Sequence, residues 1–140
     1  MLRTLIAATG IALTMGVGAT AASAADVENG EKWANRVCKA CHTFDEGGKH
    51  MVGPNLWGIV GKTPGTIEGY DYEARNPNGS AAIHFADNGI ESWTEEKLAE
   101  YIANVTAFQD EYGNGNRSAM VVSLPPNAAP DVAAYLGTLK

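Results

Sequence analysis

Two cysteines and a histidine occupy adjacent positions in the run Cys38-Lys39-Ala40-Cys41-His42. Cys-x-x-Cys-His is the attachment pattern of c-type haem. The spacing suits this chemistry because two thiols add across the two vinyl groups of the porphyrin, whose fixed separation can be spanned by two intervening residues on a helical turn. The neighbouring imidazole then lies under the ring and can ligate the iron.

The same residues allow three other interpretations: a redox dithiol, a zinc site and a plain disulfide. A thioredoxin-like dithiol needs a βαβ context, which this sequence lacks. A structural zinc site needs four ligands, and only His50 and His84 remain, at unrelated spacing. A disulfide across so short a loop would add little stability. We therefore expect one covalently bound haem c with its iron.

The start of the chain has the organisation of a secretory signal peptide. Met1-Leu2-Arg3 is short and positive, residues 5–22 are mostly apolar and small, and Ala22-Ser23-Ala24 offers a cleavage site. The alternative is a retained membrane anchor, which needs about 20 strongly apolar residues, whereas threonine and glycine dilute this run. We expect residues 1–24 to be removed on export to the periplasm and residues 25–140 to form one domain.

The chain is acidic, with a formal net charge of −6 at pH 7. Loss of Arg3 with the signal peptide lowers the number of Lys and Arg residues from 10 to 9 against 16 acidic residues, which gives −7. Phosphate binding needs basic patches, so nucleic acid is excluded as a partner.

Three segments of the mature chain show helical patterns. Asp26 can cap a helix that extends to about Cys38. Thr94, or the capping box at residues 92–95, begins a second helix, and Pro130 suits the first position of a last helix. Each segment has an apolar stripe at helical spacing. The stripes are Gly30, Trp33 and Val37; Leu98, Tyr101, Ile102 and Val105; and Val132, Tyr135, Leu136 and Leu139.

Two long segments, residues 43–89 and 106–126, show no sustained period, and we expect them to form loops. They are rich in glycine, proline, asparagine and aspartate. A structureless run as long as residues 43–89 is unusual in a small domain. It is understandable if the segment wraps a large rigid group that replaces missing protein core. The sequence therefore predicts an all-α domain in which loops supply much of the length.

From Gly30 onward the chain resembles the class I cytochromes c, close to the branch of bacterial cytochrome c2 and mitochondrial cytochrome c. The resemblance implies the cytochrome c fold, in which the N- and C-terminal helices pack together and further short helices and long loops surround one haem. The matching runs are Gly30, Cys38-Lys39-Ala40-Cys41-His42-Thr43, Gly53-Pro54-Asn55-Leu56-Trp57-Gly58, Trp93 with Leu98 and Tyr101, and Ala134-Tyr135-Leu136.

The resemblance also implies the two iron ligands. His42 is the first, and the carbonyl oxygen of Pro54 accepts a hydrogen bond from its other ring nitrogen, which fixes the tautomer. Met120, in the loop before the last helix, is the second, with His84 as the main alternative. Met51 follows His42 too closely and should stay on the histidine side of the ring. The segment from Val105 to Met120 looks several residues longer than in mitochondrial relatives.

Aromatic residues complete the implied site. The resemblance places Tyr101 near the sulfur ligand, and Trp93 together with Tyr72 or Tyr70 near the haem propionates, which can accept hydrogen bonds from their polar atoms. The alternative is that Trp93 and Tyr101 are ordinary core aromatics. Gly30 and Tyr135 are implied to form the contact between the first and last helices.

A haem with histidine and methionine ligands has no open coordination position, which favours one-electron transfer over substrate chemistry. The resemblance thus implies a soluble, periplasmic, monohaem electron carrier that is not an enzyme and has no small-molecule substrate. It would be a monomer that passes electrons from a membrane reductase to an oxidase, photosynthetic centre or denitrification enzyme through transient docking and peripheral contact with membrane complexes. The alternatives are a haem enzyme or gas sensor with an open iron position, and a haem-free thiol oxidoreductase.

Docking in mitochondrial relatives uses a ring of lysines. Because this chain is acidic, any such ring must be small, and a solvated scatter of lysines is the alternative. The candidates are Lys39, Lys49, Lys62 and Lys97.

Overall fold

The computed structural model describes residues 24–74 and 79–140, and the predicted signal peptide, residues 1–24, lies outside them except for its last residue. The described part is helical and contains no strand, which confirms the all-α prediction. Its elements are α1 (Val27–Arg36), η1 (Cys38–Ala40), η2 (Ala81–His84), α2 (Glu95–Ala103), α3 (Val105–Tyr112) and α4 (Ala129–Thr138).

Local capping explains where the predicted helices begin. The side chain of Asp26 accepts a hydrogen bond from the Asn29 backbone N–H at the start of α1. At the start of α2, the Thr94 side chain accepts from the Lys97 backbone N–H. Each cap satisfies a donor that has no partner within the first helical turn. Helix α4 begins one residue earlier than predicted, so Pro130 occupies its second position. Proline is tolerated there because the N–H groups of the first helical turn have no partner within the helix.

Helix α3 was not predicted, and the expectation of a loop over residues 106–126 is wrong for residues 106–112. The side chain of Asn104 accepts a hydrogen bond from the Ala107 backbone N–H and so starts α3 directly after α2 ends. Val105 and Phe108 are buried on its inner face. The short 3₁₀ helix η2 likewise interrupts the predicted loop over residues 43–89.

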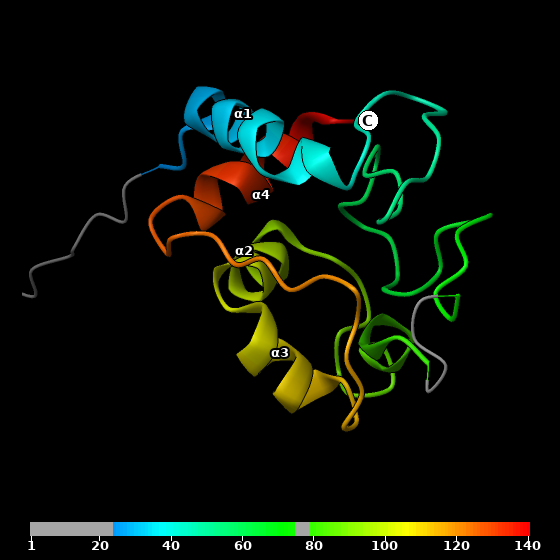
Figure 1. The fold of residues 1–140 in the computed structure, drawn as a ribbon. Coiled ribbons are helices and arrows are strands. Elements are labelled where there is room, and N and C mark those ends of the chain that lie inside the picture. The colour runs from blue at the N-terminus through cyan, green and yellow to red at the C-terminus, as the bar shows by residue number, and fades with distance from the viewer. Residues whose placement is uncertain (1–23, 75–78) are drawn as a thin grey trace, which may run out of the picture.

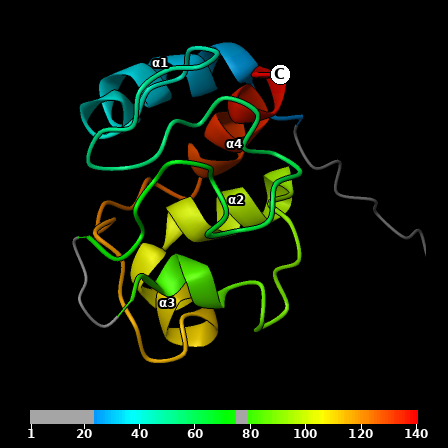
Figure 2. The same ribbon diagram turned by 90° about the vertical axis from the view of Figure 1, so that its right-hand side faces the viewer.

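The helices are stacked in order, with α1 on α4, α4 on α2, and α2 followed by α3 (Figures 1 and 2). The packing of α1 on α4 confirms the predicted contact between the first and last helices. Gly30 lies at their crossing, where a Cβ atom would be 2.0 Å from the carbonyl oxygen of Asp131 and 3.0 Å from the Cβ of Tyr135. The Asp131 carboxylate also accepts hydrogen bonds from the Asp26 backbone N–H, at 2.8 Å, and the Asn29 amide, at 2.7 Å.

Backbone hydrogen bonds fasten residues 58–62 to the chain just after α4 and just before α2. The Gly58 N–H donates to the Leu139 carbonyl at 2.7 Å. Lys62 and Trp93 face each other, with the Trp93 N–H donating to the Lys62 carbonyl at 2.8 Å, while the Gly61 N–H donates to the Trp93 carbonyl at 2.7 Å. These bonds satisfy polar backbone groups that a loop in contact with a core would otherwise leave unpaired.

An aromatic cluster joins η2, α2 and α3. Phe85, which follows η2, is fully buried and makes edge-to-face contacts with Trp93, Tyr101 and Phe108, with ring centroids 5.2–5.9 Å apart. Trp93 also stacks on Tyr101 at 5.4 Å. Such pairs add to the stabilisation that burial of the rings provides. Among the described residues, no helix is long and apolar enough to cross a membrane.

Substitution of Gly30 by alanine should destabilise the folded protein by about 2 kcal/mol, because the added methyl group overlaps the α4 backbone and forces the two helices apart. Urea denaturation of the haem-containing protein measures the change. Glu31→Ala, an exposed change on the same helix, is the control and should alter the free energy of unfolding by less than about 0.5 kcal/mol. Equal stability of the two variants would contradict a close crossing at Gly30.

Candidate functional site

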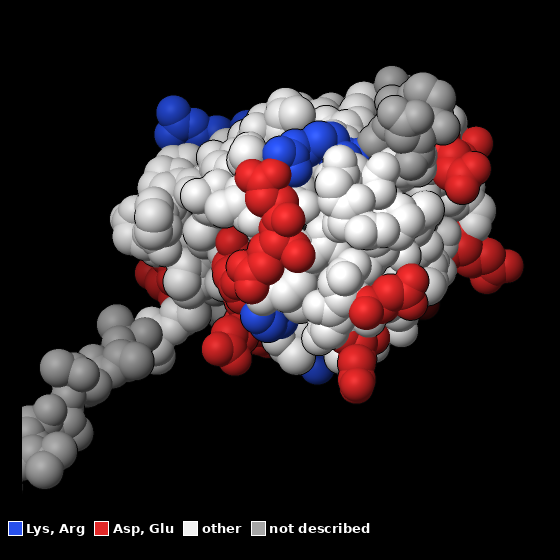
Figure 3. Space-filling model, turned by 90° about the horizontal axis from the view of Figure 1, so that it is seen from below, with Lys and Arg blue, Asp and Glu red and all other residues white. Residues whose placement is uncertain are grey.

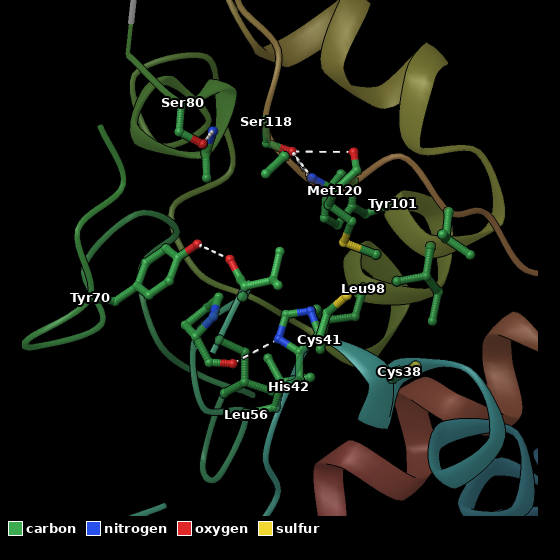
Figure 4. A pocket seen from close by; sticks show the side chains of 18 of the residues that line it. Cys38, Cys41, His42, Leu56, Tyr70, Ser80, Leu98, Tyr101, Ser118 and Met120 are labelled. Atoms are coloured by element: carbon green, nitrogen blue, oxygen red, sulfur yellow. Dashed lines mark hydrogen bonds between the residues drawn. The ribbon is translucent and has the colours of Figure 1, made fainter. Parts of the chain in front are cut away.

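A cavity lies between the helices and the irregular segment (Figure 4). One wall is helical and the other comes from loop residues, so parts of the chain that are far apart in sequence face each other. The side chains that form the two walls are mainly apolar or aromatic. The helical wall includes Leu98, Tyr101, Ile102, Val132 and Leu136, and the loop wall includes Val52, Pro54, Leu56, Ile59, Tyr70 and Tyr72. Cys38, Cys41, His42 and Met120 line the same cavity.

The two cysteines reach the cavity because the chain makes a 3₁₀ turn after α1. The backbone N–H groups of Cys41 and His42 both donate to the Cys38 carbonyl at 3.0 Å. No disulfide joins the two cysteines, which leaves both sulfur atoms available for bonds to a bound group. Burial raises the pKa of Cys38 to about 11. The pair follows a helix and no strand occurs among the described residues, which argues against a thioredoxin-like dithiol.

The His42 ring is held by one short hydrogen bond. Its Nδ1 lies 2.7 Å from the Pro54 carbonyl oxygen, and because a carbonyl only accepts, Nδ1 carries the proton. Burial lowers the pKa of His42, and the bond to Pro54 opposes this only in part. The ring is therefore neutral near pH 7, with the lone pair of Nε2 available to a metal. This is the arrangement that the family resemblance implied for His42 and Pro54.

Gly53 lets the His42 ring lie flat against the backbone. A Cβ atom at this position would be 2.2 Å from Cε1 of His42. The Gly53 N–H also donates to the Cys41 carbonyl at 2.8 Å, which fixes the segment relative to the cysteines. A glycine is needed here because any side chain would displace the imidazole.

Met120 lies in residues 114–123, which follow α3 and are called the Met120 segment below. Its side chain extends toward the His42 ring from the opposite side of the cavity (Figure 4). The alternative ligand, His84, lies in η2 and is not among the residues that line the cavity. Met51 does not line the cavity either and is 39% exposed. Of these three side chains, Met120 alone is placed to meet a group bound in the cavity.

The predicted aromatic residues also line the cavity. Tyr101 and Trp93 are buried, and the Tyr101 hydroxyl lies 3.3 Å from the Ser118 hydroxyl, next to the Met120 segment. The hydroxyl of Tyr70 donates to the Val52 carbonyl at 2.6 Å, whereas that of Tyr72 accepts a long bond of 3.4 Å from the Ile67 N–H. Trp93 and Tyr101 therefore line the cavity and also pack in the core of the protein.

Sequence reasoning missed two residues beside Met120, namely Gln109 and Ser118. Gln109 is buried in α3, and its amide bonds to Ser118 and to the Met120 backbone. The signal was present, because Val105, Phe108, Gln109 and Tyr112 follow the i, i+3, i+4, i+7 pattern of one helix face. A polar residue in the middle of that face concealed it.

The residues present fit a covalently attached haem. Two thiols lie on one turn, an imidazole and a thioether enter from opposite sides, and apolar side chains line the space between them. Within residues 24–74 and 79–140, no three His, Cys, Asp or Glu side chains are grouped closely enough to hold a metal ion by themselves, which argues against zinc.

Known proteins with similar sequences and structures point the same way. The family model for cytochrome c matches residues 27–140. The chain belongs to the cytochrome c family. It is 37% identical over 118 residues to cytochrome c2 of Rhodospirillum rubrum, covering 82% of this chain and 98% of that protein. It is 40% identical over 106 residues to cytochrome c-550 of Novispirillum itersonii, covering 74% and 89%. The ferricytochrome c2 structure of Rhodopseudomonas palustris aligns with a TM-score of 0.68 at 31% identity, over 82% of this chain and 99% of that one.

Membership of this family establishes the class of protein and its cofactor. The cytochrome contains covalently bound haem c and is a monohaem electron carrier that acts with protein partners, rather than an enzyme. The cytochrome c fold predicted from the sequence is confirmed.

Gly53→Ala should disturb iron ligation, because its methyl group would overlap the His42 ring. We expect lower haem incorporation in the exported protein and a changed ferric absorption spectrum in what remains. Pro54→Ala is the matched control: it keeps the main-chain carbonyl that accepts from Nδ1 and should retain the native spectrum. If Pro54→Ala were the more damaging change, the proline ring rather than its carbonyl would position the histidine.

Proposed function

We propose that this cytochrome is a soluble carrier in the periplasm that moves single electrons from a membrane reductase to an oxidase, a photosynthetic centre or a denitrification enzyme. The observation that carries the proposal is the entry of an imidazole and a thioether into one apolar cavity from opposite sides. With both sides of an iron occupied, no position remains for a substrate or gas, which favours outer-sphere transfer.

Each residue of the site has a defined role in this proposal. Cys38 and Cys41 form the two thioether bonds, and His42 and Met120 ligate the iron. The bound haem supplies the one-electron ferric/ferrous couple. Its surroundings then set the potential: the soft Met120 sulfur favours the ferrous state, and the apolar walls disfavour the extra charge of ferric iron. The bond from His42 to Pro54 holds the imidazole in one orientation throughout the cycle.

We assign partner docking to the mouth of the cavity. Val121 and Val122 follow Met120, line the cavity and are 78% and 53% exposed, so apolar surface is open to solvent at this edge of the cavity. A small apolar contact suits an encounter that must form and dissociate quickly.

The surface charge limits how lysines can contribute to docking. None of Lys39, Lys49, Lys62 and Lys97 lines the cavity. Lys97 bonds to Glu100 at 2.7 Å and lies over the Tyr112 ring, so its charge is partly engaged within the protein. Acidic side chains are spread over the face shown in Figure 3, with basic ones in a few places. These charges favour a basic or charge-mixed partner.

Met120→Ala should convert the carrier into a ligand-binding haem protein. The native ferrous protein should not bind carbon monoxide, whereas the variant should bind it readily and lose the near-infrared methionine–ferric band. Its reduction potential should also fall, because the soft sulfur ligand is gone. Absorption spectroscopy measures the first two changes, with the ferrous protein under carbon monoxide for the first and the ferric protein without it for the second. Ready binding by the native protein would instead favour an enzyme or sensor with an open position.

Export should yield a mature monomer that starts at residue 25 and carries one haem. The test is intact-mass analysis of the periplasmic fraction, combined with gel filtration. Cys38→Ser/Cys41→Ser should be processed at the same position but lack the haem adduct. Native protein that keeps residues 1–24 and remains with membranes would contradict the proposed localisation.

A further inference from the structure

Gln109 is a polar residue in the middle of the protein core. It lies on the inner face of α3, and only 1% of its surface is exposed. Burial of an amide is unfavourable unless both its donors and its acceptor find partners. The identity of those partners therefore shows what the residue does.

Every partner of the Gln109 side chain belongs to the Met120 segment or to the tyrosine beside it. Nε2 donates to the Ser118 hydroxyl at 2.7 Å and to the Met120 carbonyl at 3.1 Å, and it lies 3.4 Å from the Tyr101 hydroxyl. Oε1 accepts from the Ser118 backbone N–H at 3.1 Å. Because the amide has two hydrogens, the two shorter bonds, to Ser118 and Met120, are the ones it makes fully.

Ser118 extends this connection to the backbone of the methionine. Its hydroxyl accepts from the Met120 backbone N–H at 3.2 Å. The N–H of Met120 is thus reached through Ser118, while its carbonyl is reached by Gln109 directly.

The Met120 segment, residues 114–123, lies near the surface of the protein. Between Gly113 and Leu124, which are buried, none of residues 114–123 is buried. Other attachments of the segment include the exposed pair of Arg117 with Asp110, a backbone bond from the Ala81 N–H to the Arg117 carbonyl at 3.2 Å, a bond from the Val105 N–H to the Ser123 hydroxyl at 3.0 Å, and a contact of 3.3 Å between the hydroxyls of Tyr101 and Ser118. Exposed ion pairs contribute little, and none of these contacts involves Met120 itself.

We propose that Gln109 is the positioning residue for Met120, fixing the backbone on both sides of the methionine to α3 so that the thioether stays directed into the cavity. This proposal rests on Met120 being the iron ligand. Helix α3, which was not predicted from the sequence, then serves to anchor the ligand segment as well as to cover the aromatic cluster. The Tyr101 hydroxyl lies against the same amide, and the Tyr101 ring packs on Phe108 of α3.

The test is competition between Met120 and added imidazole for the ferric iron of the mature protein. Imidazole binds only when the methionine has left, so its apparent affinity reports how often the segment opens. Gln109→Leu keeps the side-chain volume and removes the three hydrogen bonds to Ser118 and Met120 together with the long contact to Tyr101. We expect it to lower the apparent dissociation constant for imidazole about tenfold and to weaken the near-infrared methionine band.

Asn104→Ala is the matched control. It removes the side chain that caps α3 but leaves the bonds of Gln109 untouched. At a comparable loss of stability in urea, its affinity for imidazole should stay within about twofold of native. If Asn104→Ala raised the affinity for imidazole as much as Gln109→Leu does, Gln109 would act only through the stability of α3 and the proposal would be wrong.

Ser118→Ala keeps the proposal testable if Gln109→Leu does not fold. It removes the hydroxyl that links Gln109 to the Met120 N–H and should also raise the affinity for imidazole. The double variant should exceed the stronger single variant by little, because both changes break one connection. Additive effects, or no effect of Ser118→Ala, would overturn the proposal. Absence of the methionine band from the native protein would instead disprove Met120 as the ligand.

Discussion

The site depends first on how closely α1 lies against α4. Without a side chain at Gly30, the two backbones meet, and Asp131 then binds both the start of α1 and Asn29. Because η1 follows α1 almost directly, this crossing determines where Cys38 and Cys41 stand relative to the helical wall. A wider crossing would carry the attachment residues away from the apolar surface that the haem must cover.

Local signals in the sequence were sufficient for three helices and for the histidine side of the site. Asp26 and Thr94 cap the helices they were expected to cap, and Pro54 accepts the bond from His42 as implied by the family motif. Such features depend on a few neighbouring residues, or on a motif whose chemistry demands its spacing. Helix α3 was harder to predict for two reasons. Its apolar face contains the polar Gln109, and a single residue, Asn104, both ends α2 and begins α3.

What could not be predicted depends on contacts between distant segments. Gln109 and Ser118 are unremarkable in sequence, and their importance appears only when α3 and the Met120 segment are brought together. The surroundings of the lysines could not be predicted for the same reason, since nothing near Lys97 in sequence shows that it lies over Tyr112. The roles of Met120 and the tyrosines in binding haem still rest on the cavity they share and on family membership.

The two sides of the iron site differ in how readily mutation can alter them. The partner of His42 is a main-chain oxygen, and a main-chain oxygen survives replacement of the residue that bears it. The Met120 side is held instead by the side chains of Gln109 and Ser118, each of which a single codon change can remove. Substitution at these two residues should therefore loosen the methionine, whereas the hydrogen bond of His42 does not depend on which side chain stands at position 54.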